Sequence, residues 1–96
     1  MQNIKLQQQA AECLALAKYS EAISLYEQSI EIDPSLMSNY WYLGLALLLQ
    51  ERETEAQLTW LSAMAEASPD QLKTWTAELT EILTSEALQR EAISDP

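Results

Sequence analysis

The chain has 96 residues, with fifteen acidic and five basic side chains for a net charge of −10, and it contains no His, one Gly and one Cys. This length fits one domain that buries about two-thirds of its unfolded surface. Without His, the usual general base, serine triads and most zinc sites are excluded. A single Gly excludes the glycine-rich loops that hold phosphates and dinucleotides, and a single Cys excludes an internal disulfide. We therefore expect a non-catalytic binding module without a cofactor or metal.

The acidic balance also restricts the partners. A surface with this charge repels the phosphates of nucleic acids and of anionic membranes. Residues 1–17 lack the cationic segment of a secretion signal, and the longest apolar run, residues 45–49, is far shorter than the roughly 20 residues that cross a bilayer. We expect a cytoplasmic chain whose partners are proteins, with no nucleic acid and no membrane among them.

Apolar residues recur at helical spacing along the chain, and prolines interrupt them. Ala22, Leu25 and Tyr26 follow an i, i+3, i+4 pattern, which is typical of one buried helix face. Pro34 and Pro69 end such segments, because Pro cannot continue a helix and disfavours helical geometry in the residue before it. No useful stretch alternates with the period of two that strands need. The sequence predicts an all-α fold of five helices, at about residues 2–16, 20–32, 36–50, 54–67 and 70–92.

Polar residues near the expected helix starts mark candidate N-caps. Ser20, Thr54 and Asp70 can each accept a hydrogen bond from a free amide in the first helical turn. The breaks at residues 18–20 and 51–54 are only three or four residues long. Connections of this length place neighbouring helices antiparallel.

The sequence resembles itself when it is shifted by 34 residues, a step that we call the repeat offset. Small and aromatic residues recur at this offset, as in the pairs Ala10–Gly44, Ala22–Ala56, Tyr26–Trp60 and Trp41–Trp75. The offset equals the period of about 34 residues of the helix-turn-helix unit in the tetratricopeptide repeat. The segment Tyr40-Trp41-Tyr42-Leu43-Gly44, with Ala56 and Trp60 after it, resembles the signature of that family. Small side chains at these positions allow the two helices of one repeat to cross closely.

This resemblance implies one domain of antiparallel helix-turn-helix repeats in a right-handed superhelix. Repeat 1 would cover about residues 3–36, repeat 2 about 37–70, and a capping helix about 71–92. A polar outer face suits a last helix, and Glu78 and Glu81 stand where repeat 2 has Gly44 and Leu47. The alternative is that the last helix begins a third repeat of a longer protein.

Members of this family hold peptides or helices on a concave surface lined by the first helix of each repeat. The resemblance points to one apolar groove in this chain, and its expected partner-binding residues are Trp41, Leu45, Leu48, Trp75, Leu79 and Ile82. Trp is enriched among the residues that dominate binding energies. The alternative is that these side chains are ordinary core, because the helix at 36–50 is apolar nearly all round and must be covered.

Two classes of function remain open. In the first, the chain is a protein-protein interaction scaffold that binds a helix, a peptide or a second copy of itself as a homodimer. In the second, it is the N-terminal recruitment or dimerisation region of a larger enzyme, such as a bacterial glycosyl- or methyltransferase, whose repeat arrays residues 40–50 resemble. A repeat fold by itself does not name the partner.

Overall fold

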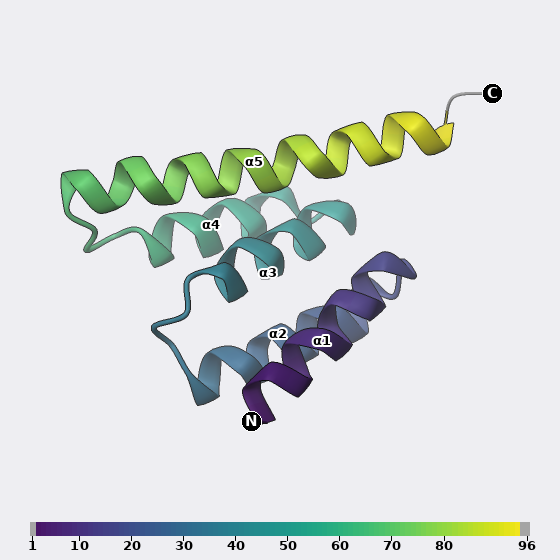
Figure 1. The fold of residues 1–96 in the computed structure, drawn as a ribbon, viewed down its shortest axis with the longest axis horizontal. Coiled ribbons are helices and arrows are strands. Elements are labelled where there is room, and N and C mark those ends of the chain that lie inside the picture. The colour runs from purple at the N-terminus through teal and green to yellow at the C-terminus, as the bar shows by residue number, and fades with distance from the viewer. Residues whose placement is uncertain (1, 95–96) are drawn as a thin grey trace. The chain divides into compact units, whose positions relative to one another are not determined.

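The computed structural model describes the backbone of residues 2–94 and the side chains of residues 5–88. Over that range the chain forms five α-helices and no strand, which confirms the predicted all-α fold (Figure 1). The helices are α1 (Gln2–Ala15), α2 (Tyr19–Ile32), α3 (Ser38–Leu49), α4 (Glu53–Ala63) and α5 (Pro69–Ser94). The chain divides into two compact units, Met1–Ala65 with α1 to α4 and Glu66–Pro96 with α5.

Within the first unit, each helix packs on the next one in the sequence. α1 contacts α2, α2 contacts α3, and α3 contacts α4 (Figure 1). The connections are short and reverse the chain, so neighbouring helices run antiparallel. We call α1 with α2 the first hairpin and α3 with α4 the second hairpin.

The turns inside the two hairpins have the same backbone geometry, one repeat offset apart. Ala17 and Glu51 both adopt positive φ, at 61° and 65°. The amide of Lys18 donates to the carbonyl of Cys13 at 2.8 Å, and the amide of Arg52 donates to the carbonyl of Leu47 at 2.9 Å. A left-handed residue followed by this long backward bond is the Schellman motif, which satisfies the last carbonyls of a helix. The second hairpin therefore repeats the turn of the first.

This turn explains why two predicted N-caps are wrong. α2 has Lys18 at its N-cap and α4 has Arg52, and neither side chain makes a capping bond. The residue directly after the left-handed one is already the N-cap of the next helix, so Ser20 and Thr54 lie inside the first turn. The hydroxyl of Ser20 instead accepts a hydrogen bond from Gln50 Nε2 at 2.7 Å, which joins the two hairpins.

The start of α5 also differs from the prediction that Asp70 caps it. The amide of Gln71 donates to Ser68 Oγ at 3.2 Å, and the amide of Ser68 donates to Gln71 Oε1 at 3.0 Å. This reciprocal pair is a capping box, and Pro69 fits the first helical position because its missing N–H needs no partner there. Asp70 lies in the first turn, where a carboxylate favours the helix dipole.

Small residues lie where the helices of each hairpin cross. Ala10, Ala22 and Ala56 are fully buried, and Gly44 is buried as well. The core of the first unit forms around them, with the buried members Ala10, Ala22, Ile23, Tyr26, Leu43, Ala46, Leu47 and Ala56. The spacing of small residues that the sequence shows therefore coincides with the core of the hairpins.

Gly44 is needed because the indole of Trp60 lies directly against the backbone of α3. A Cβ added at Gly44 would lie 2.0 Å from Trp60 Nε1, far inside the contact distance of two heavy atoms. The same Nε1–H donates to the carbonyl of Trp41 at 3.2 Å. The only glycine of the chain therefore serves a close approach between α3 and α4, and both turns use non-glycine residues.

A pair of tyrosines joins the two hairpins across α2 and α3. The rings of Tyr26 and Tyr42 stack with 5.8 Å between centroids and 12° between planes. Tyr26 is buried, and burial raises the pKa of its hydroxyl above the ordinary value. This contact forms part of the packing of α2 against α3 inside the first unit.

Candidate protein-binding surface

α3 is apolar on two faces, and only one of them belongs to the core of the first unit. Seven of its twelve residues are buried. Leu43, Ala46 and Leu47 belong to the core cluster, and Leu48 is half-buried and packs against that cluster. Trp41 and Leu45 lie outside it, one helical turn apart, and are 1% and 3% exposed. The helix therefore carries a second apolar face beyond the one that its hairpin uses.

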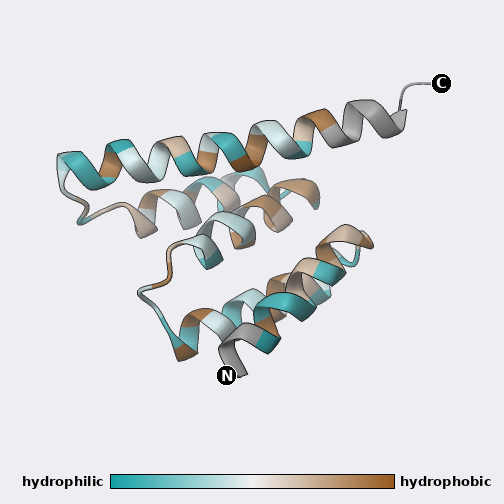
Figure 2. Cartoon of the chain, in the orientation of Figure 1, coloured by the Kyte–Doolittle hydropathy of each residue, from teal (hydrophilic) through white to brown (hydrophobic). Residues whose placement is uncertain are grey.

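The other three predicted partner-binding residues form one row on α5. Trp75, Leu79 and Ile82 are spaced i, i+4, i+7, which places them on one helix face. Leu79 is buried, and Trp75 and Ile82 are half-buried. Hydrophilic and hydrophobic residues alternate along the described part of α5 (Figure 2). The six predicted residues are thus divided equally between the two units, and their role in binding stays a prediction.

The corresponding position of α1 is polar. Gln7 stands one repeat offset before Trp41, and its Nε2 donates to Asn39 Oδ1 at 3.0 Å. Asn39 is 1% exposed, and its Nδ2 has no hydrogen-bond partner among the described residues. The sequence gives no signal for this pair, because Asn39 does not belong to the apolar pattern. The apolar row that begins at Trp41 therefore has no apolar counterpart at Gln7.

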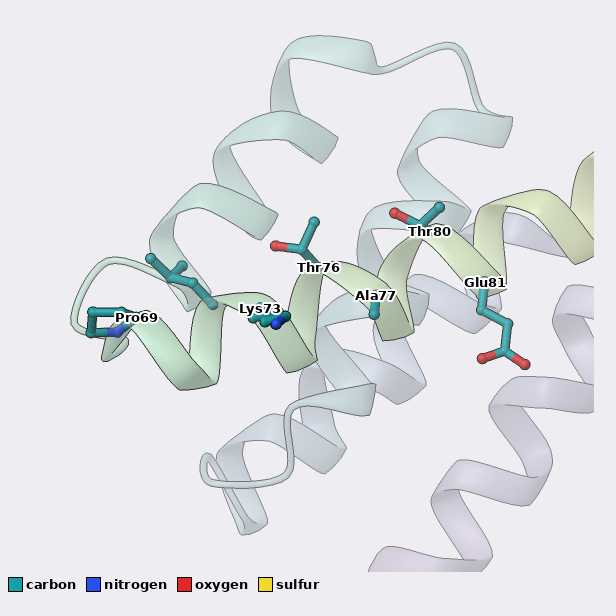
Figure 3. A pocket seen from close by; sticks show the side chains of 7 residues that line it. Pro69, Lys73, Thr76, Ala77, Thr80 and Glu81 are labelled. Carbon is teal, nitrogen blue, oxygen red and sulfur yellow. The ribbon is translucent and has the colours of Figure 1, made fainter.

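A shallow depression follows one face of α5. Every described residue that lines it comes from this helix, at helical spacing (Figure 3): Pro69, Leu72, Lys73, Thr76, Ala77, Thr80 and Glu81. A face of one helix does not enclose a ligand or exclude water, as a small-molecule site needs. The depression therefore lacks the enclosure of a small-molecule site.

The predicted partner-binding residues do not include an exposed apolar pair on the outer face of α4. Leu58 and Leu61 are 58% and 67% exposed, and their i, i+3 spacing places them on the same side of the helix. One repeat offset earlier in the chain stand Ser24 and Glu27. A signal was present, since the apolar residues of α4 are not confined to one face. Periodicity alone could not tell which of them face solvent.

A salt bridge lies at the start of α4. Arg52 and Glu55 form a two-pronged pair, in which Arg52 Nη2 donates to Glu55 Oε1 at 2.9 Å and Nε donates to Oε2. The hydrogen bond to Arg52 lowers the pKa of the Glu55 carboxyl below its ordinary value. Both side chains are solvent-exposed, so the pair positions charge at the surface and adds little stability.

Among the residues that the structure describes, no group of three or more His, Cys, Asp or Glu side chains is placed to hold a metal ion. Cys13 Sγ lies 3.7 Å from Glu21 Oε2, and desolvation together with that carboxylate raises the pKa of the thiol. A thiol with a raised pKa is a poor nucleophile at neutral pH. No helix in the same part of the chain combines the length and apolar character that crossing a membrane requires.

The comparisons with known proteins identify no relative. No protein-family model, no curated protein and no solved structure matches the chain.

Proposed function

We propose that the chain is a non-catalytic protein-interaction module, built from two repeats of the tetratricopeptide type, that binds an α-helix or peptide of a partner protein. The observation that carries the proposal is the second apolar face of α3, where Trp41 and Leu45 lie outside the core of the first unit. The first hairpin has Gln7 and Ala11 at these two positions. A hairpin of this kind therefore folds without large apolar residues at these positions. We propose that Trp41 and Leu45 are present because they bind the partner.

The proposal extends to α5 through the same repeat offset. Trp75, Leu79 and Ile82 follow Trp41, Leu45 and Leu48 at that offset. Trp and large aliphatic residues supply most of the energy at interfaces between helices and grooves. We propose that each row contacts the partner.

The burial of Trp41 and Leu45 affects how fast the chain can associate with its partner. At 1% and 3% exposure, neither side chain is accessible until the region around it opens. Association that waits for a conformational change is slower than the about 10⁵–10⁷ M⁻¹s⁻¹ of ordinary docking. We therefore expect slow association, limited by the protein at high partner concentration.

A cytoplasmic location belongs to the same proposal. Cys13 is a free cysteine that is partly exposed. A reducing compartment preserves such a thiol, whereas oxidising compartments favour disulfides.

The test begins with peptides of about 20 residues selected on the chain from a random display library, a length at which single helices become stable. One selected peptide is titrated by calorimetry into the parent chain and into the Trp41→Ala/Trp75→Ala variant. We expect the variant to bind at least about tenfold more weakly while its far-ultraviolet circular dichroism stays near that of the parent. Leu16→Ser is the control, because Leu16 is 63% exposed and lies outside both rows.

Two outcomes would contradict the proposal. If helical signal and binding fall together in both single variants, Trp41→Ala and Trp75→Ala, the two residues are ordinary core. If the double variant binds as well as the parent, the rows are not the binding surface. Sedimentation at several concentrations shows whether the bound partner is a second copy, because a dimer of the parent would then become a monomer in the double variant.

A further inference from the structure

The outer face of α4 exposes two leucines that the packing of the first unit does not use. Leu58 and Leu61 are 58% and 67% exposed, while the same helix buries Ala56 and packs Trp60 against the core. At the equivalent positions of α2 the chain has Ser24 and Glu27. The two hairpins share their turn geometry, so the fold accepts polar residues at these positions. The leucines therefore need another explanation than the stability of the hairpin.

The sequence directly before this apolar pair is acidic. The segment 51–55 contains three glutamates and one arginine, and all four side chains are exposed: Glu51, Arg52, Glu53 and Glu55. The arginine is bound to Glu55. The segment therefore keeps a net charge of −2, from Glu51 and Glu53. A partner with apolar anchors and flanking Lys or Arg would complement both properties of the face.

A second copy of the chain fits this face poorly. The other copy would bring the same acidic segment and a net charge of −10, and like charges in contact oppose association. Two leucine side chains also cover only a small part of the about 800 Å² per partner that a standard stable interface buries. A short segment of another protein, held transiently, does not need that area.

We propose that the outer face of α4 is a second docking surface, and that its occupant is a cationic amphipathic helix of a partner protein. The apolar side of that helix contacts Leu58 and Leu61, and its Lys or Arg residues complement the acidic charge of segment 51–55. This surface does not depend on the apolar rows of α3 and α5.

The probe is a fluorescein-labelled peptide of about 18 Leu and Lys residues, with Leu at i, i+3, i+4 and i+7, and fluorescence anisotropy reports its binding to the full chain. The test variant is Leu58→Ser/Leu61→Glu, which gives α4 the residues of α2. The matched control is Leu16→Ser/Leu88→Glu, which makes the same chemical changes at leucines 63% and 61% exposed elsewhere. Both variants have the same composition and the same net charge.

We expect the test variant to bind about tenfold more weakly than the control, although its added carboxylate should attract a cationic peptide more strongly. A second peptide with Glu in place of each Lys should not bind the parent. Backbone amide shifts of the parent, recorded with the cationic peptide, should change mainly between residues 54 and 65. This mapping gives an answer even where a variant folds poorly.

Three results would overturn the proposal. Equal binding by the test and control variants would mean that charge alone attracts the peptide. Amide shifts centred outside residues 54–65 would place the peptide elsewhere. A parent dimer that the test variant converts to a monomer would make a second copy the occupant of the face.

Discussion

The two hairpins of the first unit have the same turn geometry but carry different side chains at equivalent positions. Their turns recur at the repeat offset, including a left-handed residue in each, Ala17 and Glu51. The first hairpin has Gln7 on its first helix and Ser24 and Glu27 outside its second. The second hairpin has Trp41 on its first helix and Leu58 and Leu61 outside its second. The shared turn geometry therefore does not require these large apolar residues, and we propose that interaction with a partner explains them.

The hairpins also differ in one pair of residues at equivalent positions. The first combines Ala10 with Tyr26, and the second combines Gly44 with Trp60. Tyr26 and Trp60 occupy equivalent positions, but the larger indole lies where a Cβ of residue 44 would be. The large indole of Trp60 therefore requires a residue without a side chain at position 44. Four predictions test how far this comparison of the hairpins holds.

The largest effect is expected from Gly44→Ala. The new methyl group would overlap Trp60, and such overpacking costs about 1–3 kcal/mol and occasionally more, against about 1 kcal/mol gained in helix propensity. We expect a net loss of up to about 2 kcal/mol in the free energy of unfolding, measured by urea denaturation. Adding Trp60→Tyr recreates the Ala–Tyr pair of the first hairpin and should recover most of the loss. A double variant as unstable as the sum of both singles would refute this coupling.

The next effect concerns alkaline pH and Tyr26. Burial raises the pKa of this hydroxyl in the folded state, so the unfolded chain loses the proton first, near the ordinary value of about 10. The stabilisation is complete below that pH and declines as the pH rises above it, by at most about 1.4 kcal/mol per pH unit. Tyr26→Phe removes this contribution, so its stability should fall less steeply between about pH 10 and 12. Identical slopes for parent and variant, measured by urea denaturation, would show that the burial has no such effect.

A smaller gain in stability is expected at the two turns. Ala17→Gly and Glu51→Gly place the residue best suited to positive φ at each Schellman motif. We expect each change to stabilise the chain by about 0.5–1 kcal/mol, and to a similar degree because the turns share one geometry. Ala11→Gly, at an exposed position inside α1, is the control and should destabilise by about 1 kcal/mol. A stabilised turn in only one hairpin would contradict the equivalence of the two.

The smallest effect on stability is expected for Leu58→Ser/Leu61→Glu. Exposed substitutions away from packed features change the free energy of unfolding by about 0.5 kcal/mol or less. Thermal unfolding should therefore give nearly the same midpoint for this variant and the parent. A large fall would mean that the leucines stabilise the hairpin, and the need for a binding role would disappear.

Much of the fold follows from the sequence, and part of the surface does not. The spacing of Pro34 and Pro69 and the small residues at positions 10, 22, 44 and 56 predict the helices and their crossings, because these residue types have strong local or steric consequences. The predicted N-caps Ser20 and Thr54 are wrong because Ala and Glu seldom adopt positive φ, so the residue types at positions 17 and 51 do not indicate such a turn. α3 is apolar around most of its circumference and the apolar residues of α4 are not confined to one face, so only tertiary packing decides which of their leucines are exposed.

The most direct test of the account follows the backbone amides of the chain as a library-selected peptide is added. If the second hairpin and α5 carry the binding rows, the shift changes should concentrate in residues 38–63 and 69–88, with few changes in residues 5–32. Shift changes that spread equally over both hairpins, or that are confined to the first, would contradict the claim that the additional apolar residues of the second hairpin bind a partner.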